Sequence, residues 1–181
     1  MCDKRVASRW LEMSELCLGL HQLMSRKLRV LIVDDNSMFR RILRRMIQVY
    51  CNQKVESIHE ASNPVDGLKL LGEKPFDFVF MDIDMPELSG IETTKIIRGH
   101  DPRWKLHPHQ PLPCNRTIPI AAVTTNDTPL DQATYANAGM TQFLPKPFSH
   151  NQVSSLLSQA HEANSFCPNL ANESVALVAI I

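Results

Sequence analysis

FDFVFMDIDMP, residues 76–86, is the stretch that decides the fold. Residues 78–81 are apolar without polar alternation, which predicts a strand buried on both faces, as inside a parallel sheet. Asp82 follows where this strand ends, and Pro86 marks the turn beyond it because proline cannot extend a sheet ladder. Ligands of open α/β sheets bind at the carboxyl ends of the strands, so Asp82 is placed for chemistry. A single aspartate after a strand is also typical of a turn or helix cap, so the rest of the chain must decide.

A second apolar run, LRVLIV at residues 28–33, ends in Asp34 and Asp35. If the two predicted strands are parallel neighbours, three carboxylates meet at one edge of the sheet. Two such charges about 4 Å apart repel by roughly 4 kcal/mol at an effective dielectric constant near 20. The cluster of Asp34, Asp35 and Asp82 therefore needs a cation or raised pKa values. Mg²⁺ fits this need, because it takes oxygen ligands and retains water.

The composition indicates one globular domain with extensions, because the chain has 181 residues, 44% of them hydrophobic, and a formal net charge of zero. This charge balance gives no reason to expect nucleic acid as a partner. The cysteines are odd in number and scattered, which predicts free thiols in a reducing compartment. They are Cys2, Cys17, Cys51, Cys114 and Cys167. We therefore expect a cytoplasmic protein, or a nuclear one in a eukaryote.

Residues 1–27 are predicted to form an amphipathic helical extension. Apolar residues recur at spacings of three and four between Trp10 and Met24, which is the stripe of such a helix. The stripe can pack on the domain, pair with a second copy, or be weakly ordered. Glu12 and Glu15 interrupt the apolar core that a secretory signal needs, so export is not expected. Met24 directly precedes the first strand and is an alternative translational start.

The domain proper, residues 28–160, alternates predicted strands with predicted helices. Capping residues mark several helix starts, and Gly72 and Gly139 are expected to end two helices. Five strands alternating with five helices predict a doubly wound α/β fold. The remaining strands are expected at 55–61, 118–123 and 142–144, and the helices at 37–49, 63–72, 89–98, 129–138 and 149–160.

Residues 100–117 are predicted to be an inserted loop, because four prolines interrupt them without any periodicity. His107, His109 and Cys114 lie in this insert. They lack the second close pair of a metal site, so we interpret the insert as a variable surface excursion.

Basic residues line the expected helix at 37–49 on the side opposite its apolar face. They are Arg40, Arg41, Arg44 and Arg45. Such a face is either simply solvated or a docking surface for an acidic partner, and both readings stay open.

Side chains of distinct chemistry follow four of the predicted strands: Asp34 with Asp35, then Asp82, Thr124 and Lys146. Carboxylates, a hydroxyl donor and an ammonium together make a set suited to handling phosphoryl groups. The segments LRVLIVDDN, FVFMDIDMPELSGIE, VTTN and FLPKPF stand in this order. From about Leu28 to Gln159 the chain resembles a CheY-like receiver domain of the two-component response regulators. The resemblance implies a flavodoxin-like parallel sheet in the strand order 2-1-3-4-5.

The resemblance also implies the roles of the acidic residues. Asp82 would be the phosphoacceptor, attacking the phosphorus of a phosphohistidine on a histidine kinase or histidine phosphotransfer protein. Asp35, Asp82 and the backbone carbonyl of Asp84 would contact Mg²⁺ directly, and Asp34 would act largely through water. A domain of this kind acts on itself and is not an enzyme with turnover.

The last two strands carry the residues that would read the phosphoryl group. The resemblance implies that Lys146 pairs with phosphoryl oxygens, that Thr124 donates to one of them, and that the Lys146–Pro147 bond is cis. Phe143 matches the switch aromatic, which turns inward when Thr124 moves. This would change the face formed by the fourth helix, fifth strand and fifth helix of the domain, which could bind a downstream protein or a second copy.

Two positions depart from the usual pattern near the acceptor. Asp84 and Asn126 could each steer the water that hydrolyses the acyl phosphate, so both are candidates for tuning dephosphorylation. A competing reading is a phosphatase of the haloacid dehalogenase type, with Asp82 as nucleophile and Asp84 as general acid. Pro86 stands where that family wants Thr or Val, and the acidic pair precedes the nucleophile, so the order is wrong.

No separate output domain is expected after Gln159. The protein would then be a stand-alone receiver, or its own ends would respond to phosphorylation. The tail, residues 161–181, closes with an apolar stretch at 175–181 that is too short to span a bilayer, so no membrane partner is expected.

Overall fold

Five strands form one parallel sheet in the order β2-β1-β3-β4-β5. The structure, a computed structural model, describes residues 26–102 and 108–166, and residues 27–160 make one compact unit. Each pairing along the sheet is parallel, so the predicted doubly wound, flavodoxin-like fold is confirmed. The strands are β1 (Leu28–Val33), β2 (Val55–Ala61), β3 (Phe78–Asp82), β4 (Ile120–Thr124) and β5 (Gln142–Pro145).

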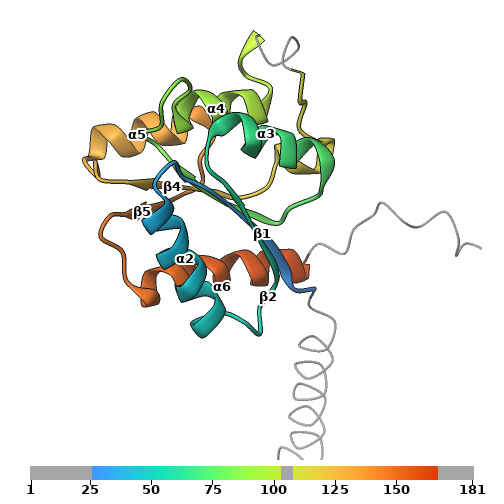
Figure 1. Cartoon of the computed structure of the whole chain (residues 1–181), viewed down its shortest axis with the longest axis vertical. Coiled ribbons are helices and arrows are strands. Elements are labelled where there is room, and N and C mark those ends of the chain that lie inside the picture. The colour runs from blue at the N-terminus through green and yellow to red at the C-terminus, as the bar shows by residue number, and fades with distance from the viewer. Residues whose placement is uncertain (1–25, 103–107, 167–181) are drawn as a thin grey trace, which may run out of the picture. The chain divides into compact units, whose positions relative to one another are not determined.

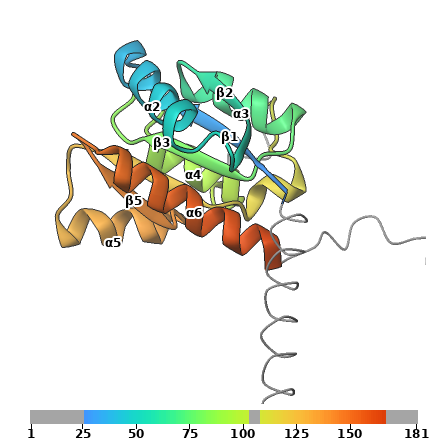
Figure 2. The ribbon, with the colours of Figure 1, turned by 90° about the horizontal axis from the view of Figure 1, so that it is seen from below.

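Helices cover both faces of the sheet. Figure 1 shows α3, α4 and α5 on one face and α2 and α6 on the other. In Figure 2, seen from below, α2 and α6 cross the near face of the sheet. The helices are α2 (Ser37–Tyr50), α3 (Pro64–Glu73), α4 (Gly90–Arg98), α5 (Pro129–Ala138) and α6 (His150–Phe166), with a short 3-10 helix, η2 (Pro113–Arg116).

The central strand separates two apolar cores. Val79 and Met81 pack with residues of α3 and α4, whereas Phe78 and Phe80 pack with residues of α2 and α6. All the residues of β3 are buried, as its uninterrupted apolar run predicts. Since the strand side chains fill the two cores, the residues that follow the strands remain at the carboxyl edge of the sheet.

The predicted caps are present where the helices begin. The Asn63 side chain accepts from the Asp66 backbone N–H, and Thr128 and Asp131 form a reciprocal capping box at the start of α5. Gly139 ends α5 with a φ of 100°, a left-handed conformation that glycine adopts at little cost. These local signals explain why the helix starts were predictable.

Several predicted boundaries are wrong. The β4 strand begins at Ile120 instead of residue 118, and α6 continues beyond residue 160 to Phe166. Gly72 does not stop α3, which runs through it to Glu73. A Cβ at Gly72 would lie 2.9 Å from the backbone oxygen of Gln110, so this glycine lets the insert pass close to the helix.

The second half of the insert is anchored, although we expected a surface excursion. Asn115 is fully buried. Its side-chain amide donates to the backbone oxygens of Leu71 and Lys74, at 2.6 and 2.7 Å, and accepts from the Phe76 N–H at 2.8 Å. This asparagine thereby joins η2 to the end of α3 and the start of β3.

Arg98, at the end of α4, makes a second anchor at the same edge of the sheet. Its guanidinium donates to the backbone oxygens of Gly139, Arg116 and Ile118 at 2.8–3.0 Å. Burial lowers the pKa of this guanidinium from its usual value. Together Arg98 and Asn115 fix both the entry to β4 and the end of the insert.

Several sequence interpretations lie outside the described residues. They are residues 1–25 of the amphipathic extension predicted at 1–27, the alternative start at Met24, the tail from residue 167, and His107 of the insert. None of the helices within the described ranges is long and apolar enough to cross a membrane.

Candidate functional site

Three carboxylates meet at the carboxyl edge of the sheet. Asp34 and Asp35 directly follow Val33, the last residue of β1, and Val33 is paired with Met81, which precedes Asp82 on β3. One carboxylate oxygen from each aspartate lies within 4.8 Å of the others. Asp34 and Asp82 are buried, whereas Asp35 is exposed to solvent. The structure therefore brings together the acidic residues that the sequence placed at one sheet edge.

Lys146, directly after β5, joins two of these carboxylates. Its ammonium donates to Asp34 Oδ2 at 2.9 Å and to Asp82 Oδ1 at 3.0 Å, and the side chain is 7% exposed. The ammonium also lies 4.2 Å from the centre of the Phe39 ring, a cation–π contact. The peptide bond from Lys146 to Pro147 is cis, as the resemblance implies.

The charges in this pocket do not cancel. Three carboxylates and one ammonium leave a formal charge of −2 (−3 + 1). Burial raises the pKa of Asp82, the hydrogen bond from Lys146 opposes this, and the charges of Asp34 and Asp35 add to the rise. Burial alone would lower the pKa of Lys146, but its hydrogen bonds to Asp34 and Asp82 and the negative charges of these two residues together outweigh burial and raise it. Lys146 is therefore a cation at neutral pH, and the pocket retains an excess of negative charge.

The start of α2 holds the acidic pair in place. Asn36 caps this helix by accepting from the Met38 N–H, and its own N–H donates to Asp34 Oδ1 at 2.8 Å. Arg40 reaches back from the first turn and donates to the backbone oxygens of Asp34 and Asp35, at 2.6 and 3.1 Å. Helix α2 and the acidic cluster are therefore built as one unit.

The basic side of α2 is not one uniform face. Arg40 binds backbone oxygens and is only 16% exposed, so it belongs to the site. Arg44 pairs with Glu60 at 2.6 Å, and Arg41 and Arg45 are exposed. From the sequence, these four arginines form one group, because helical spacing does not indicate which side chain reaches back to the residues before the helix.

The turn after Asp82 is closely packed. The Gly90 N–H donates to the Ile83 oxygen at 3.0 Å, and a Cβ at Gly90 would clash with the backbone oxygen of Asp82. Glu87 has a φ of 67°, a left-handed conformation that side chains other than glycine adopt at a cost. Asp84, in the same turn, is exposed. A glycine at position 90 is thus required for the chain to turn directly behind the candidate acceptor.

Thr124 lies next to the cluster, at the end of β4, and belongs to a buried polar network. Its hydroxyl accepts from the Asn126 N–H at 3.0 Å and lies 3.2 Å from the Tyr135 hydroxyl. The Tyr135 ring in turn contacts the ring of Phe143, with centroids 6.1 Å apart. Asn126 is exposed, and Phe143 is partly buried against the core.

Phe39, Arg40 and Tyr135 were missed by the sequence reasoning. Phe39 falls on the apolar face of the helix predicted at 37–49, and Tyr135 was given no role. The Asn36–Ser37 step after the acidic pair indicates a helix start, which could have suggested that the first turn of α2 contacts the cluster. Tyr135 carries no such local signal, because its partner Thr124 is on another element.

Fold and site together define the class of protein. A parallel α/β domain with a buried aspartate, two further carboxylates, a lysine ammonium and a threonine hydroxyl at one sheet edge is a domain built to handle phosphoryl groups. The family model for the response regulator receiver domain matches residues 30–158, and the chain belongs to this family. The family consists of phosphorelay signalling modules, not of phosphatases of the haloacid dehalogenase type.

Individual proteins agree with this assignment. Stress response regulator protein 1 of Debaryomyces hansenii is 34% identical over 122 residues, which cover 67% of this chain and 44% of that protein. The chain thus spans less than half the length of this curated relative.

Solved structures share the fold. The receiver domain of Ssk1, crystallised with the histidine phosphotransfer protein Ypd1 of Saccharomyces cerevisiae, is 25% identical with a TM-score of 0.62, covering 77% of this chain and 92% of that one. The receiver domain of the sensor histidine kinase PA1611 of Pseudomonas aeruginosa is 22% identical with a TM-score of 0.61, covering 76% and 99%. That domain was solved with a magnesium ion in its active-site cleft.

Proposed function

We propose that this chain accepts a phosphoryl group on Asp82 from a phosphohistidine, in a reaction that depends on Mg²⁺. One observation carries the proposal, namely the Lys146 ammonium bridging Asp34 and Asp82 inside a cluster of three carboxylates at the sheet edge. A carboxylate meant only for structure would be neutralised by its partners. Here the partners leave negative charge uncompensated in a largely buried place.

The donor set fits Mg²⁺. The cluster offers carboxylate oxygens and an exposed member, Asp35, and its net charge favours a divalent cation. Asp35, Asp82 and the backbone oxygen of Asp84 would hold the ion, with Asp34 acting through water. When bound, Mg²⁺ supplies positive charge that offsets the carboxylates and the phosphoryl oxygens.

In the proposed transfer, a carboxylate oxygen of Asp82 forms a bond to phosphorus while the bond from phosphorus to the donor imidazole nitrogen breaks. The electron pair stays on that nitrogen, and a proton already carried by the other ring nitrogen makes the leaving group a neutral imidazole, so no acid or base is needed in the pocket. The Lys146 ammonium then exchanges its hydrogen bond to Asp82 for hydrogen bonds to phosphoryl oxygens, and the Thr124 hydroxyl donates a hydrogen bond to one of these oxygens. Asp84 and Asn126, both exposed beside the pocket, are proposed to tune hydrolysis of the product.

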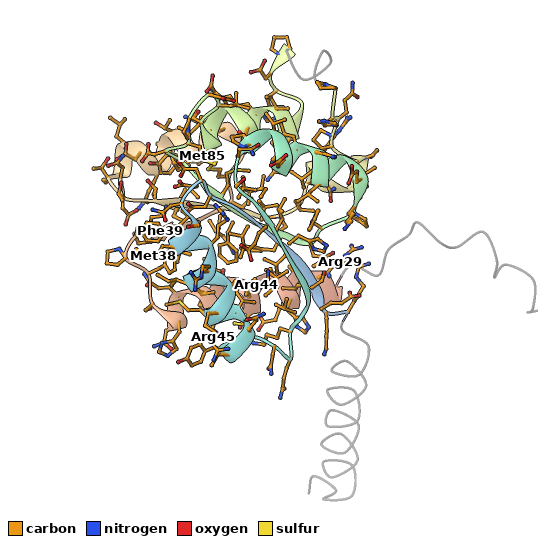
Figure 3. The ribbon with its side chains drawn as sticks, in the orientation of Figure 1. Arg29, Met38, Phe39, Arg44, Arg45 and Met85 are labelled. Carbon is orange, nitrogen blue, oxygen red and sulfur yellow. The ribbon has the colours of Figure 1, made fainter. Side chains whose placement is uncertain are left out.

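The phosphoryl donor is proposed to be a histidine kinase or a histidine phosphotransfer protein that docks on α2. This helix begins directly beside the cluster, and its first half exposes the apolar side chains of Met38 at 60% and Ile42 at 38%. Figure 3 shows Met38 at the end of α2 nearest the site and Arg45 toward its other end. Exposed apolar residues beside arginines suit a partner with an apolar patch and acidic groups, which supports the docking reading of this basic helix.

Signalling is proposed to proceed through Thr124 and Phe143 to the face formed by α5, β5 and α6. A downstream protein or a second copy of the chain would bind this face. The receiver domain is proposed to act by binding a partner through this face, with a response of residues 1–23 and 162–181 to phosphorylation as the alternative. Measuring the solution mass with and without beryllofluoride, in chains with and without residues 1–23 and 162–181, separates the two.

Radiolabelled phosphoryl transfer from a panel of histidine kinases tests the proposal. Wild-type protein should be labelled once per chain in the presence of Mg²⁺, and Asp82→Asn should remain unlabelled. Asp66→Asn is the matched control, because Asp66 is an exposed carboxylate that only caps α3. Labelling of Asp82→Asn, or continuous turnover of a phosphomonoester, would contradict the proposal.

A further inference from the structure

Tyr135 holds the hydroxyl of Thr124 in a defined direction. Both residues are buried, Thr124 at 1% and Tyr135 at 3% exposure. The Tyr135 hydroxyl donates to the backbone oxygen of Asn126 at 3.1 Å and lies 3.2 Å from the Thr124 hydroxyl oxygen. A carbonyl oxygen can only accept, so the single proton of Tyr135 is committed to Asn126.

The direction of the remaining bond follows from this count of protons. Since the Tyr135 proton is already used, the bond between the hydroxyls must be donated by Thr124 and accepted by Tyr135. The other side of the Thr124 oxygen accepts the Asn126 N–H. The only proton of the Thr124 hydroxyl therefore points at Tyr135 in this structure.

A phosphoryl group on Asp82 competes for that same proton. We infer that Tyr135 is a positioning residue that holds Thr124 in the resting arrangement and must release it before Thr124 can bind a phosphoryl oxygen. This inference rests on the proposed function, in which Thr124 donates to the phosphoryl group. It adds a residue on α5 to a switch otherwise made of Thr124 and Phe143.

The release would be transmitted through the tyrosine ring. The ring of Tyr135 contacts that of Phe143 at an interplanar angle of 43° and belongs to the same core as α3 and α4. Once Thr124 leaves, the buried Tyr135 oxygen loses a donor, which favours a change in ring position. Since β5 carries Phe143 and α5 carries Tyr135, two of the three elements of the proposed signalling face would respond together.

Beryllofluoride with Mg²⁺, titrated into the full chain, is the probe for this competition. Tyr135→Phe removes one neutral hydrogen bond from the resting state and should tighten beryllofluoride binding about fivefold. It should lengthen the lifetime of phosphorylated Asp82 by a similar factor. The same substitution in a Thr124→Val background should change neither quantity, because valine has no hydroxyl to release. Tyr50→Phe is the matched control, since the chain has two tyrosines and Tyr50 is 55% exposed on α2.

The outcomes separate the two proposals. If wild type binds beryllofluoride and Tyr135→Phe binds it equally or more weakly, the role of Tyr135 is wrong while the proposed function stands. If the wild-type protein binds no beryllofluoride, the proposed function fails. The hydrogen bond between Thr124 and Tyr135 is then tested only by the free energies of unfolding measured in urea. There, Tyr135→Phe and Thr124→Val should be non-additive, and additive losses would overturn the inference.

Discussion

The two edges of the sheet treat buried polar groups in opposite ways. At the amino edge, both the oxygen and the nitrogen of the Asn115 side-chain amide form hydrogen bonds, and the Arg98 guanidinium donates to several backbone oxygens. At the carboxyl edge, Asp34 and Asp82 share the single ammonium of Lys146, and negative charge is left over. The amino edge is saturated and therefore architectural, whereas the carboxyl edge is unsaturated and therefore available for chemistry.

The largest effect should come from removing the ammonium that bonds the carboxylates of Asp34 and Asp82 at the carboxyl edge. Lys146→Met leaves the phosphoryl oxygens without their ammonium, and transfer to Asp82 should slow about 10³-fold, the loss typical of a preorganised donor. Transfer rates from a purified phosphohistidine donor measure this. Lys69→Met, an exposed lysine on α3, is the control and should transfer at the wild-type rate. Near-normal transfer by Lys146→Met would contradict the claim that the carboxyl edge is available for phosphoryl chemistry.

The next effect should fall on stability at the opposite edge. Asn115→Ala leaves the Lys74 oxygen and the Phe76 N–H without this partner and takes one of two donors from the Leu71 oxygen, so the free energy of unfolding should drop by about 3 kcal/mol. Urea unfolding measures the loss, and Asn137→Ala, an exposed position on α5, should be close to neutral. At urea concentrations below its own unfolding midpoint, the Asn115→Ala protein should still accept a phosphoryl group at the wild-type rate. A loss of transfer without a loss of stability would show that the edges are not independent.

The smallest effect concerns Asp82 itself. Burial and its acidic neighbours raise its pKa, so the folded state keeps the proton to higher pH than the unfolded chain. Stability is therefore lost as pH rises from the unfolded pKa through the raised folded pKa. Asp82→Asn lacks the titrating group and should not show this loss. Between pH 4 and pH 7 its free energy of unfolding should therefore rise by about 1 kcal/mol relative to that of the wild type. Urea midpoints at both pH values measure the difference, and an equal difference at both would contradict a raised pKa.

The sequence predicted the carboxyl edge better than the amino edge, and the reason is physical. The acidic pair and Asp82 come at the ends of buried apolar runs, Lys146 follows a short predicted strand, and the strand ends of a parallel sheet converge by topology alone. Asn115 sits among prolines in a segment without periodicity, and Arg98 ends a helix where a basic residue is ordinary. Their backbone partners lie on other elements, so nothing near them in the chain marks them as buried.

The same limit explains the residues missed within the site. Arg40 and Arg44 are one helical turn apart and both pair with Glu60, yet only Arg40 also binds the backbone of the acidic pair. Tyr135 and Thr124 meet only because α5 packs beside β4. Spacing predicts which face a side chain occupies, but the direction of a hydrogen bond depends on which acceptors the fold brings near.

The anchoring of the insert has a practical consequence for engineering. Arg98 and Asn115 clamp the chain on either side of residues 99–114, at the edge opposite the acceptor. Extending a loop between fixed ends costs little, roughly 0.6 kcal/mol for each doubling of its length. A fluorescent reporter or affinity tag inserted between Arg98 and Asn115 should leave the acceptor site unchanged. Such a protein could be used to follow phosphorylation in living cells.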